Sequence, residues 1–99
     1  MTINIQFVNL DYSDSLAEDT RVKLKKMAEK YDWLINADVF FKEEGTNPEK
    51  GKICNIKLSL PGPQIFATSD EKNFEMSVKE TISDLEIQLK KRKQTFVAH

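Results

Sequence analysis

The 99-residue sequence contains very little cysteine or histidine. Its one cysteine, Cys54, excludes an internal disulfide and any zinc site that needs several cysteines. Its one histidine, His99, ends the chain, where a frayed tail is the expected structure. The apolar runs are too short to span a bilayer, and no basic segment followed by an apolar one predicts a signal peptide. These absences predict a cytoplasmic protein with no metal site and no membrane partner.

The groups that catalysis needs are also scarce. The three glycines are isolated turn residues, so they form no phosphate-binding loop. Cys54 has no histidine partner and lies inside an expected strand, which favours an inert core thiol. Glu43 and Glu44 are adjacent on an expected strand and should face opposite sides, which is poor geometry for an acid–base pair. We therefore expect no enzyme activity, no cofactor and no small-molecule substrate.

The composition describes a folded chain with an uneven distribution of charge. It is 39% hydrophobic and 31% charged, values that are typical of a globular protein, and its length predicts a single domain over residues 1–99. The formal net charge is only −1. However, residues 21–30 carry five cations against one acid, and residues 88–99 carry four cations and no acid. A generic polyanion binder is not expected, but two local basic surfaces are.

Four segments are predicted to be strands. Residues 2–8 alternate apolar and polar side chains, which indicates a half-buried strand. Residues 37–44 and 52–60 are the second and third strands, and residues 64–69 are a short fourth one. Between the last two, the segment Pro-Gly-Pro at 61–63 forces a turn, because neither proline can donate to a strand ladder.

Two segments are predicted to be helices. The first begins with a capping box at Ser15, with Ser13 as the alternative cap, and runs to about Lys30. The second covers residues 71–93, with Ser69 or Asp70 as its cap. Helical spacing places one apolar stripe on each helix. The stripes are Leu16, Thr20, Leu24, Met27 and Tyr31 on the first, and Phe74, Val78, Ile82, Leu85, Leu89 and Phe96 on the second.

The order of these elements is β-α-β-β-β-α, which predicts an α+β fold similar to double-stranded-RNA-binding domains. A four-stranded sheet with both helices packed on one face would bury both apolar stripes at once. The other face of the sheet would then be at least partly open to solvent.

The basic clusters on the two helices allow two interpretations. Lys23, Lys26 and Lys30 lie on one flank of the first helix, and residues 90–93 (Lys-Lys-Arg-Lys) end the second. Each cluster alone is typical of a solvated face, and cations near a helix end also complement the helix dipole. If both helices cover the same sheet face, their flanks would instead form one phosphate-binding strip. Tyr31 and Trp33 fit either core or rim packing or the stacking of RNA bases.

Several segments, taken in order, form a recognisable pattern. They are residues 23–27 (Lys-Leu-Lys-Lys-Met), 31–32 (Tyr-Asp), the turn at 61–63, Phe74, and 85–93 (Leu-Glu-Ile-Gln-Leu-Lys-Lys-Arg-Lys). This pattern resembles the family of ribosome hibernation-promoting factors and ribosome-associated inhibitors, in its short form, which is also described as the sigma-54 modulation proteins. The resemblance covers nearly the whole chain.

Two positions depart from the pattern of this family. Asp84 stands where the family often has lysine, and Ile87 stands where it often has arginine. Two expected phosphate contacts are therefore missing. Either an RNA surface would depend on the first helix and on residues 90–93, or the affinity for the ribosome would be weaker.

The resemblance implies a stress or stationary-phase protein that binds the small ribosomal subunit and its rRNA. It would occupy the channel of messenger and transfer RNA, inhibit translation, and favour inactive ribosome dimers. The residues expected to contact rRNA are the cations of the two helices: Lys23, Lys26, Lys30, Lys79, Lys90, Lys91, Arg92 and Lys93.

A second hypothesis remains, in which the protein is a non-catalytic interaction module that uses its open sheet face or a sheet edge. The lysines would then be ordinary solubilising charge. Exposed apolar residues clustered on the face away from the helices would favour this alternative.

Overall fold

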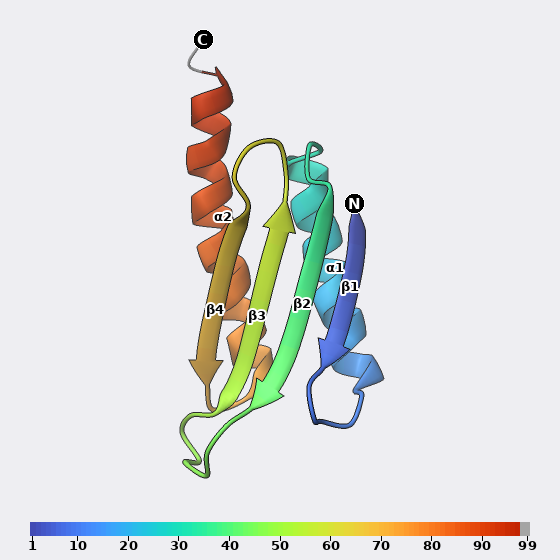
Figure 1. The fold of residues 1–99 in the computed structure, drawn as a ribbon, viewed down its shortest axis with the longest axis vertical. Helices are drawn as coiled ribbons and strands as arrows, with labels where there is room; N and C mark the ends of the chain where they lie inside the picture. The colour runs from blue at the N-terminus through green and yellow to red at the C-terminus, as the bar shows by residue number, and fades with distance from the viewer. Residues whose placement is uncertain (98–99) are drawn as a thin grey trace.

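The structure, a computed structural model, describes residues 1–97, so the predicted frayed tail at His99 lies outside the described residues. Figure 1 shows a sheet with two helices behind it. The elements are β1 (Thr2–Phe7), α1 (Asp14–Lys30), β2 (Asn36–Glu43), β3 (Lys52–Ser59), β4 (Ile65–Glu71) and α2 (Phe74–Val97). The predicted β-α-β-β-β-α order and the α+β class are confirmed.

The four strands form one sheet in the order β1-β2-β3-β4. β1 and β2 are parallel, because α1 carries the chain back between them, and the two later pairs are antiparallel hairpins. The register lines up apolar side chains across all four strands. One such row is Ile5, Val39, Ile56 and Ala67.

Both helices cover the same face of the sheet, and the core lies between them and this face (Figure 1). The stripe residues Leu24 and Met27 of α1 and Leu85 and Leu89 of α2 are fully buried. α2 also approaches β3 through small polar residues. The Thr81 hydroxyl donates to the Ser77 carbonyl at 2.7 Å and lies 3.3 Å from the Cys54 carbonyl. These bonds satisfy the buried hydroxyl, which would otherwise be costly inside the core.

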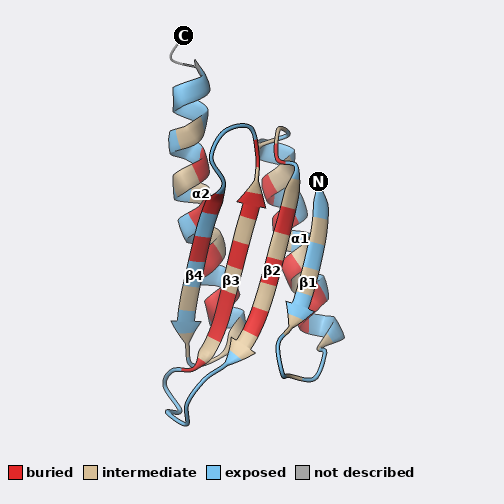
Figure 2. Cartoon of the chain, viewed as in Figure 1, coloured by how far each residue is buried: buried red, intermediate tan, exposed pale blue. Residues whose placement is uncertain are grey.

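The opposite face of the sheet is mostly polar, and its strands alternate buried and partly exposed residues (Figure 2). The amide of Asn4 donates to Asn36 at 3.2 Å and to Asp38 at 3.1 Å, which links β1 to β2. Phe66 is 56% exposed on β4, but its register partner on β3 is Lys57. Within residues 1–97, this face has no cluster of exposed apolar residues of the kind that would favour the interaction-module hypothesis.

The start of α2 differs from the prediction. β4 continues to Glu71, and α2 begins only at Phe74. Ser69 and Asp70 both lie within β4, so neither is its cap. The Asp70 carboxylate instead accepts from the Gly51 amide at 2.6 Å. The side chain of Asn73 accepts from the Met76 amide at 2.8 Å instead, as an N-cap residue does.

The cap of α1 and the end of α2 also differ. Ser13, the alternative cap, accepts from the Leu16 amide at 3.3 Å, so α1 starts two residues earlier than a Ser15 cap would allow. α2 continues past Lys93 to Val97 and projects beyond the sheet (Figure 1). For this reason Phe96 is 42% exposed and packs on Trp33 rather than on a strand.

Candidate nucleic-acid interface

The two helices run in the same direction on the sheet (Figure 1). Basic side chains of both helices line a shared hollow. Lys23, Lys26 and Lys30 of α1 and Lys79 of α2 line one hollow of about 230 Å³ between the helices. Ile82 and Glu86 complete its lining. Four of the predicted cations are therefore gathered at one site by tertiary packing.

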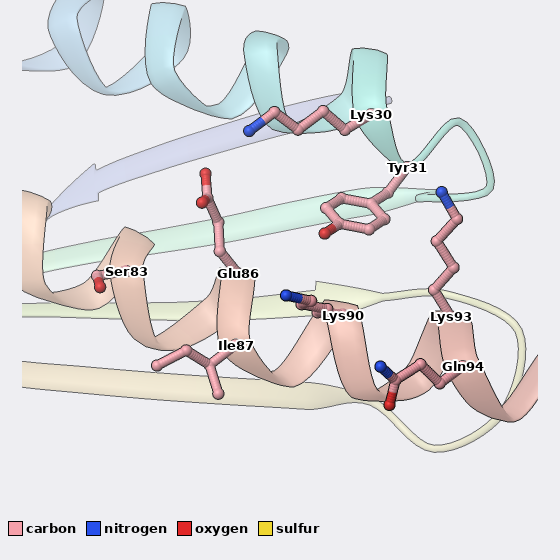
Figure 3. A pocket seen from close by; sticks show the side chains of 8 residues that line it. All are labelled: Lys30, Tyr31, Ser83, Glu86, Ile87, Lys90, Lys93 and Gln94. Atoms are coloured by element: carbon pink, nitrogen blue, oxygen red, sulfur yellow. The ribbon is translucent and has the colours of Figure 1, made fainter.

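A second hollow of about 680 Å³ continues toward the ends of the helices (Figure 3). Lys90 and Lys93 join Lys30 in its lining, together with the ring of Tyr31. The two hollows share Lys30 and Glu86, so they form one surface that we name the basic groove. Its lysines are Lys23, Lys26, Lys30, Lys79, Lys90 and Lys93.

Most of the positive charge of the basic groove is not neutralised. Lys23 forms an ion pair with Asp19 at 2.8 Å, one helical turn earlier in the chain. Within residues 1–97, the other five lysines form no ion pair. Unpaired, solvated ammonium groups on both walls of a groove are suited to contacts with a phosphate backbone.

Two predicted contact residues, Lys91 and Arg92, do not line the basic groove. Arg92 Nη1 donates to the Pro61 carbonyl at 3.2 Å. The same nitrogen is so close to the turn that a Cβ atom added at Gly62 would lie 3.1 Å from it. Arg92 therefore holds the β3–β4 turn against α2. Lys91 is exposed, and whether it contacts a partner stays a prediction.

Tyr31 and Trp33 are half-buried and pack against the core. Their rings meet edge to face at 5.6 Å, and Trp33 meets Phe96 in the same way at 5.0 Å. The Lys93 ammonium lies 5.9 Å from the centre of the Tyr31 ring. This packing accounts for both aromatics as rim residues, while Tyr31 also forms part of the groove wall.

Cys54 is fully buried, as expected for a core thiol. Burial disfavours the thiolate and raises the pKa of Cys54 to about 12, although the Thr81 hydroxyl lowers it slightly. A thiol with this pKa is a poor nucleophile. Within residues 1–97, no group of three metal-ligating side chains is found, and no helix is long and apolar enough to cross a membrane.

A family model described as "Sigma 54 modulation protein / S30EA ribosomal protein" matches residues 3–96. The chain belongs to this family. The S30EA family consists of ribosome-associated modulation factors rather than enzymes. No curated protein matches the sequence.

Solved structures agree with this assignment to the S30EA family. A ribosomal subunit interface protein from Coxiella burnetii is 30% identical, with a TM-score of 0.81, over 94% of this chain and 98% of that chain. The N-terminal domain of Protein Y from Thermus thermophilus is 22% identical, with a TM-score of 0.78, over 92% and 98% of the two chains. The second similarity supports the fold alone.

Sequence reasoning missed the one acid of the basic groove, Glu86. The signal was a seven-residue spacing, because Lys79, Glu86 and Lys93 lie two turns apart on one face of α2. Of the two departures from the S30EA family pattern, Ile87 lines the groove and is 56% exposed. Asp84 does not line it and accepts from the Gln88 amide at 3.2 Å.

Proposed function

We propose that this protein is a ribosome hibernation factor that binds the small ribosomal subunit through the basic groove. It occupies the channel of messenger and transfer RNA, inhibits translation under stress, and favours inactive ribosome dimers. The observation that carries this proposal is the basic groove itself, in which lysines from two helices line one continuous surface.

The electrostatics of the groove support rRNA as the ligand. Each ammonium group that neutralises a phosphate releases condensed counterions, and this release supplies affinity without any catalytic group. The net charge of the protein is only −1, but six of its lysines line the basic groove. This effect is therefore concentrated on one face of the protein. A ligand that follows this face must carry regularly spaced negative charges, as an RNA backbone does.

The shape of the molecule and its relatives support the location. The chain is 49 Å long but only 22 and 18 Å in its other dimensions, so it fits a narrow channel lengthwise. The C. burnetii relative is named for the interface between ribosomal subunits. A rigid protein in a channel that messenger and transfer RNA must enter inhibits translation by occupancy alone.

The test is co-pelleting of the purified protein with small and, separately, large ribosomal subunits across a salt series. We expect binding to the small subunit that weakens with a log–log slope of roughly −4 to −6, one unit for each lysine contact. Large subunits are the matched control and should retain little protein. Absence of co-pelleting with small subunits at low salt would refute the proposal.

The consequences of binding are measured separately. Added protein should lower the yield of a cell-free translation reaction, and excess messenger RNA should compete with it for free small subunits. Gradient sedimentation of ribosomes incubated with the protein would test the dimer. Binding without inhibition would reject the channel as the binding site.

A further inference from the structure

The basic groove contains one acidic side chain, which phosphate binding alone does not explain. Glu86 lines both hollows, so it lies where the two halves of the groove meet. Figure 3 shows its side chain projecting from α2 toward α1, where Lys30 stands. Glu86 is half-buried, and within residues 1–97 it forms no ion pair.

A carboxylate at this position repels phosphate, so it divides the groove into two phosphate-binding parts. Lys23, Lys26 and Lys79 lie in one hollow, and Lys90 and Lys93 lie in the other. A backbone that follows both parts must present something other than a phosphate to Glu86. An ionised carboxylate only accepts hydrogen bonds, so the group opposite it must be a donor.

The sugar–phosphate backbone of RNA has one hydrogen-bond donor, the ribose 2′-hydroxyl, and that of DNA has none. We propose that Glu86 makes the basic groove selective for RNA by accepting a hydrogen bond from a 2′-hydroxyl between two bound phosphates. This inference rests on the proposed function, since it takes the groove as the surface that holds the nucleic acid.

Glu86 would have a different role if it only formed an ion pair with another residue of α2. Lys90 is four residues later on α2, a spacing at which opposite charges stabilise a helix. In that role Glu86 would lower the affinity for RNA and DNA alike, because it would only reduce the charge of the groove. The two roles therefore predict different relative affinities for nucleic acids that differ only in their sugar.

The experiment compares three short hairpins of one sequence, made of RNA, of 2′-O-methyl RNA and of DNA, by fluorescence anisotropy. 2′-O-methyl RNA keeps the bases and phosphates but lacks the donor. Wild-type protein should prefer RNA to both others by about tenfold, the value of one charge-assisted hydrogen bond. In Glu86→Ala the preference should fall to about twofold or less, mainly because the other two hairpins bind more tightly.

Glu80→Ala is the matched control, because it removes the same charge from an exposed position of α2 outside the groove. It should keep the tenfold preference. The inference is overturned if wild-type protein binds RNA and 2′-O-methyl RNA equally, or if Glu86→Ala keeps the preference. It is also overturned if no hairpin binds at low salt while the protein still pellets with small subunits. Loss of that co-pelleting is the separate failure of the proposed function.

Discussion

The two helices start at one end of the molecule and finish toward the other (Figure 1). The side chains that line the hollows at these two ends differ in charge. The lysines of the basic groove extend from the second turn of α2 and the middle of α1 to the late turns of both helices. At the starting end is a hollow of about 340 Å³, lined by two acidic and four apolar side chains and one serine, which we name the acidic hollow. Its lining is Phe7, Leu10, Asp11, Ser13, Leu16, Phe74 and Glu75.

Helix stability explains most of the negative charge at this end, with the exception of Asp11, which precedes the N-cap of α1. Asp14 and Glu75 lie in the first turns of α1 and α2, where a negative charge complements the helix dipole. Ser13 is the N-cap of α1. These residues would be favourable in a protein that binds nothing.

The same explanation accounts for Lys30, in the last turn of α1, but not for the rest of the basic groove. Lys79 lies in the second turn of α2, where the dipole gives a cation no advantage, and α2 has no cation in its last turn. Lys23 lies in the middle of α1. The charge of the groove therefore exceeds what helix stability requires, and this excess is what points to a polyanionic partner.

The largest effect is expected from reversing two charges in the groove. Lys26→Glu with Lys90→Glu replaces a cation on each wall by an acid, which removes two phosphate contacts and adds two repulsions. We expect the affinity for small subunits to fall on the order of a hundredfold. Co-pelleting measures the loss, and circular dichroism should show an intact fold.

The matched control moves each reversal by one residue. Lys25→Glu with Lys91→Glu changes the total charge equally, on the same two helices, but outside the groove. We expect less than a tenfold loss of affinity. Equal losses in the two double variants would show that total charge, and not the groove, determines binding.

A smaller effect tests whether variants of the basic groove keep the core packed around Cys54. Cys54 lies under α2 beside Thr81, and burial raises its pKa from 9.0 to about 12. Between these values the unfolded chain loses the thiol proton while the folded one keeps it, so the free energy of unfolding falls as the pH rises. It should fall by about 1 kcal/mol between pH 9 and pH 10, whereas below about pH 8 the thiol contributes almost no pH dependence.

Urea unfolding at these two pH values measures the change, with Cys54→Ala as the control that lacks the thiol. The fall attributable to the thiol should be the same in the double variants of the basic groove. A groove variant that lacks this pH-dependent fall would have lost the packing around Cys54, and its binding defect would then be structural.

Sequence periodicity was sufficient to predict the layers of this fold, because each helix carries one apolar stripe and the strands carry turn signals between them. Boundaries were harder to predict. The capping side chain of α2 is Asn73, since Asp70 is held by the Gly51 amide across a hairpin. That contact joins residues far apart in the sequence, so local patterns around Asp70 do not reveal it.

The candidate site shows the same limit. The run from Lys90 to Lys93 is one cluster in the sequence, but 100° per residue on a helix spreads it over the whole circumference. Packing then separates it into Lys90 and Lys93 in the groove and Arg92 on the β3–β4 turn. Similarly, Lys79 was isolated in the sequence, and it joins the flank of α1 only because the helices are parallel (Figure 1).

This separation predicts opposite effects for two neighbouring residues. Arg92→Ala removes the hydrogen bond to Pro61 and should destabilise the protein by about 0.5–1 kcal/mol while leaving ribosome affinity within about twofold. Lys93→Ala should leave stability nearly unchanged and lower affinity about threefold to tenfold. Urea unfolding and co-pelleting are measured on both variants. If Arg92→Ala weakens binding as much as Lys93→Ala, Arg92 also contacts the ribosome.

The smallest effect is expected at the acidic hollow. Asp11→Asn with Glu75→Gln removes two charges there, and Lys26→Gln with Lys90→Gln is the matched pair in the groove. Because exposed charges are screened beyond about 8 Å at physiological salt, the acidic pair should change ribosome affinity by less than about twofold. The lysine pair should reduce the salt-dependence slope by about two units. If the acidic pair weakens binding tenfold instead, this end contacts a basic surface of the ribosome, and helix stability no longer explains its charge.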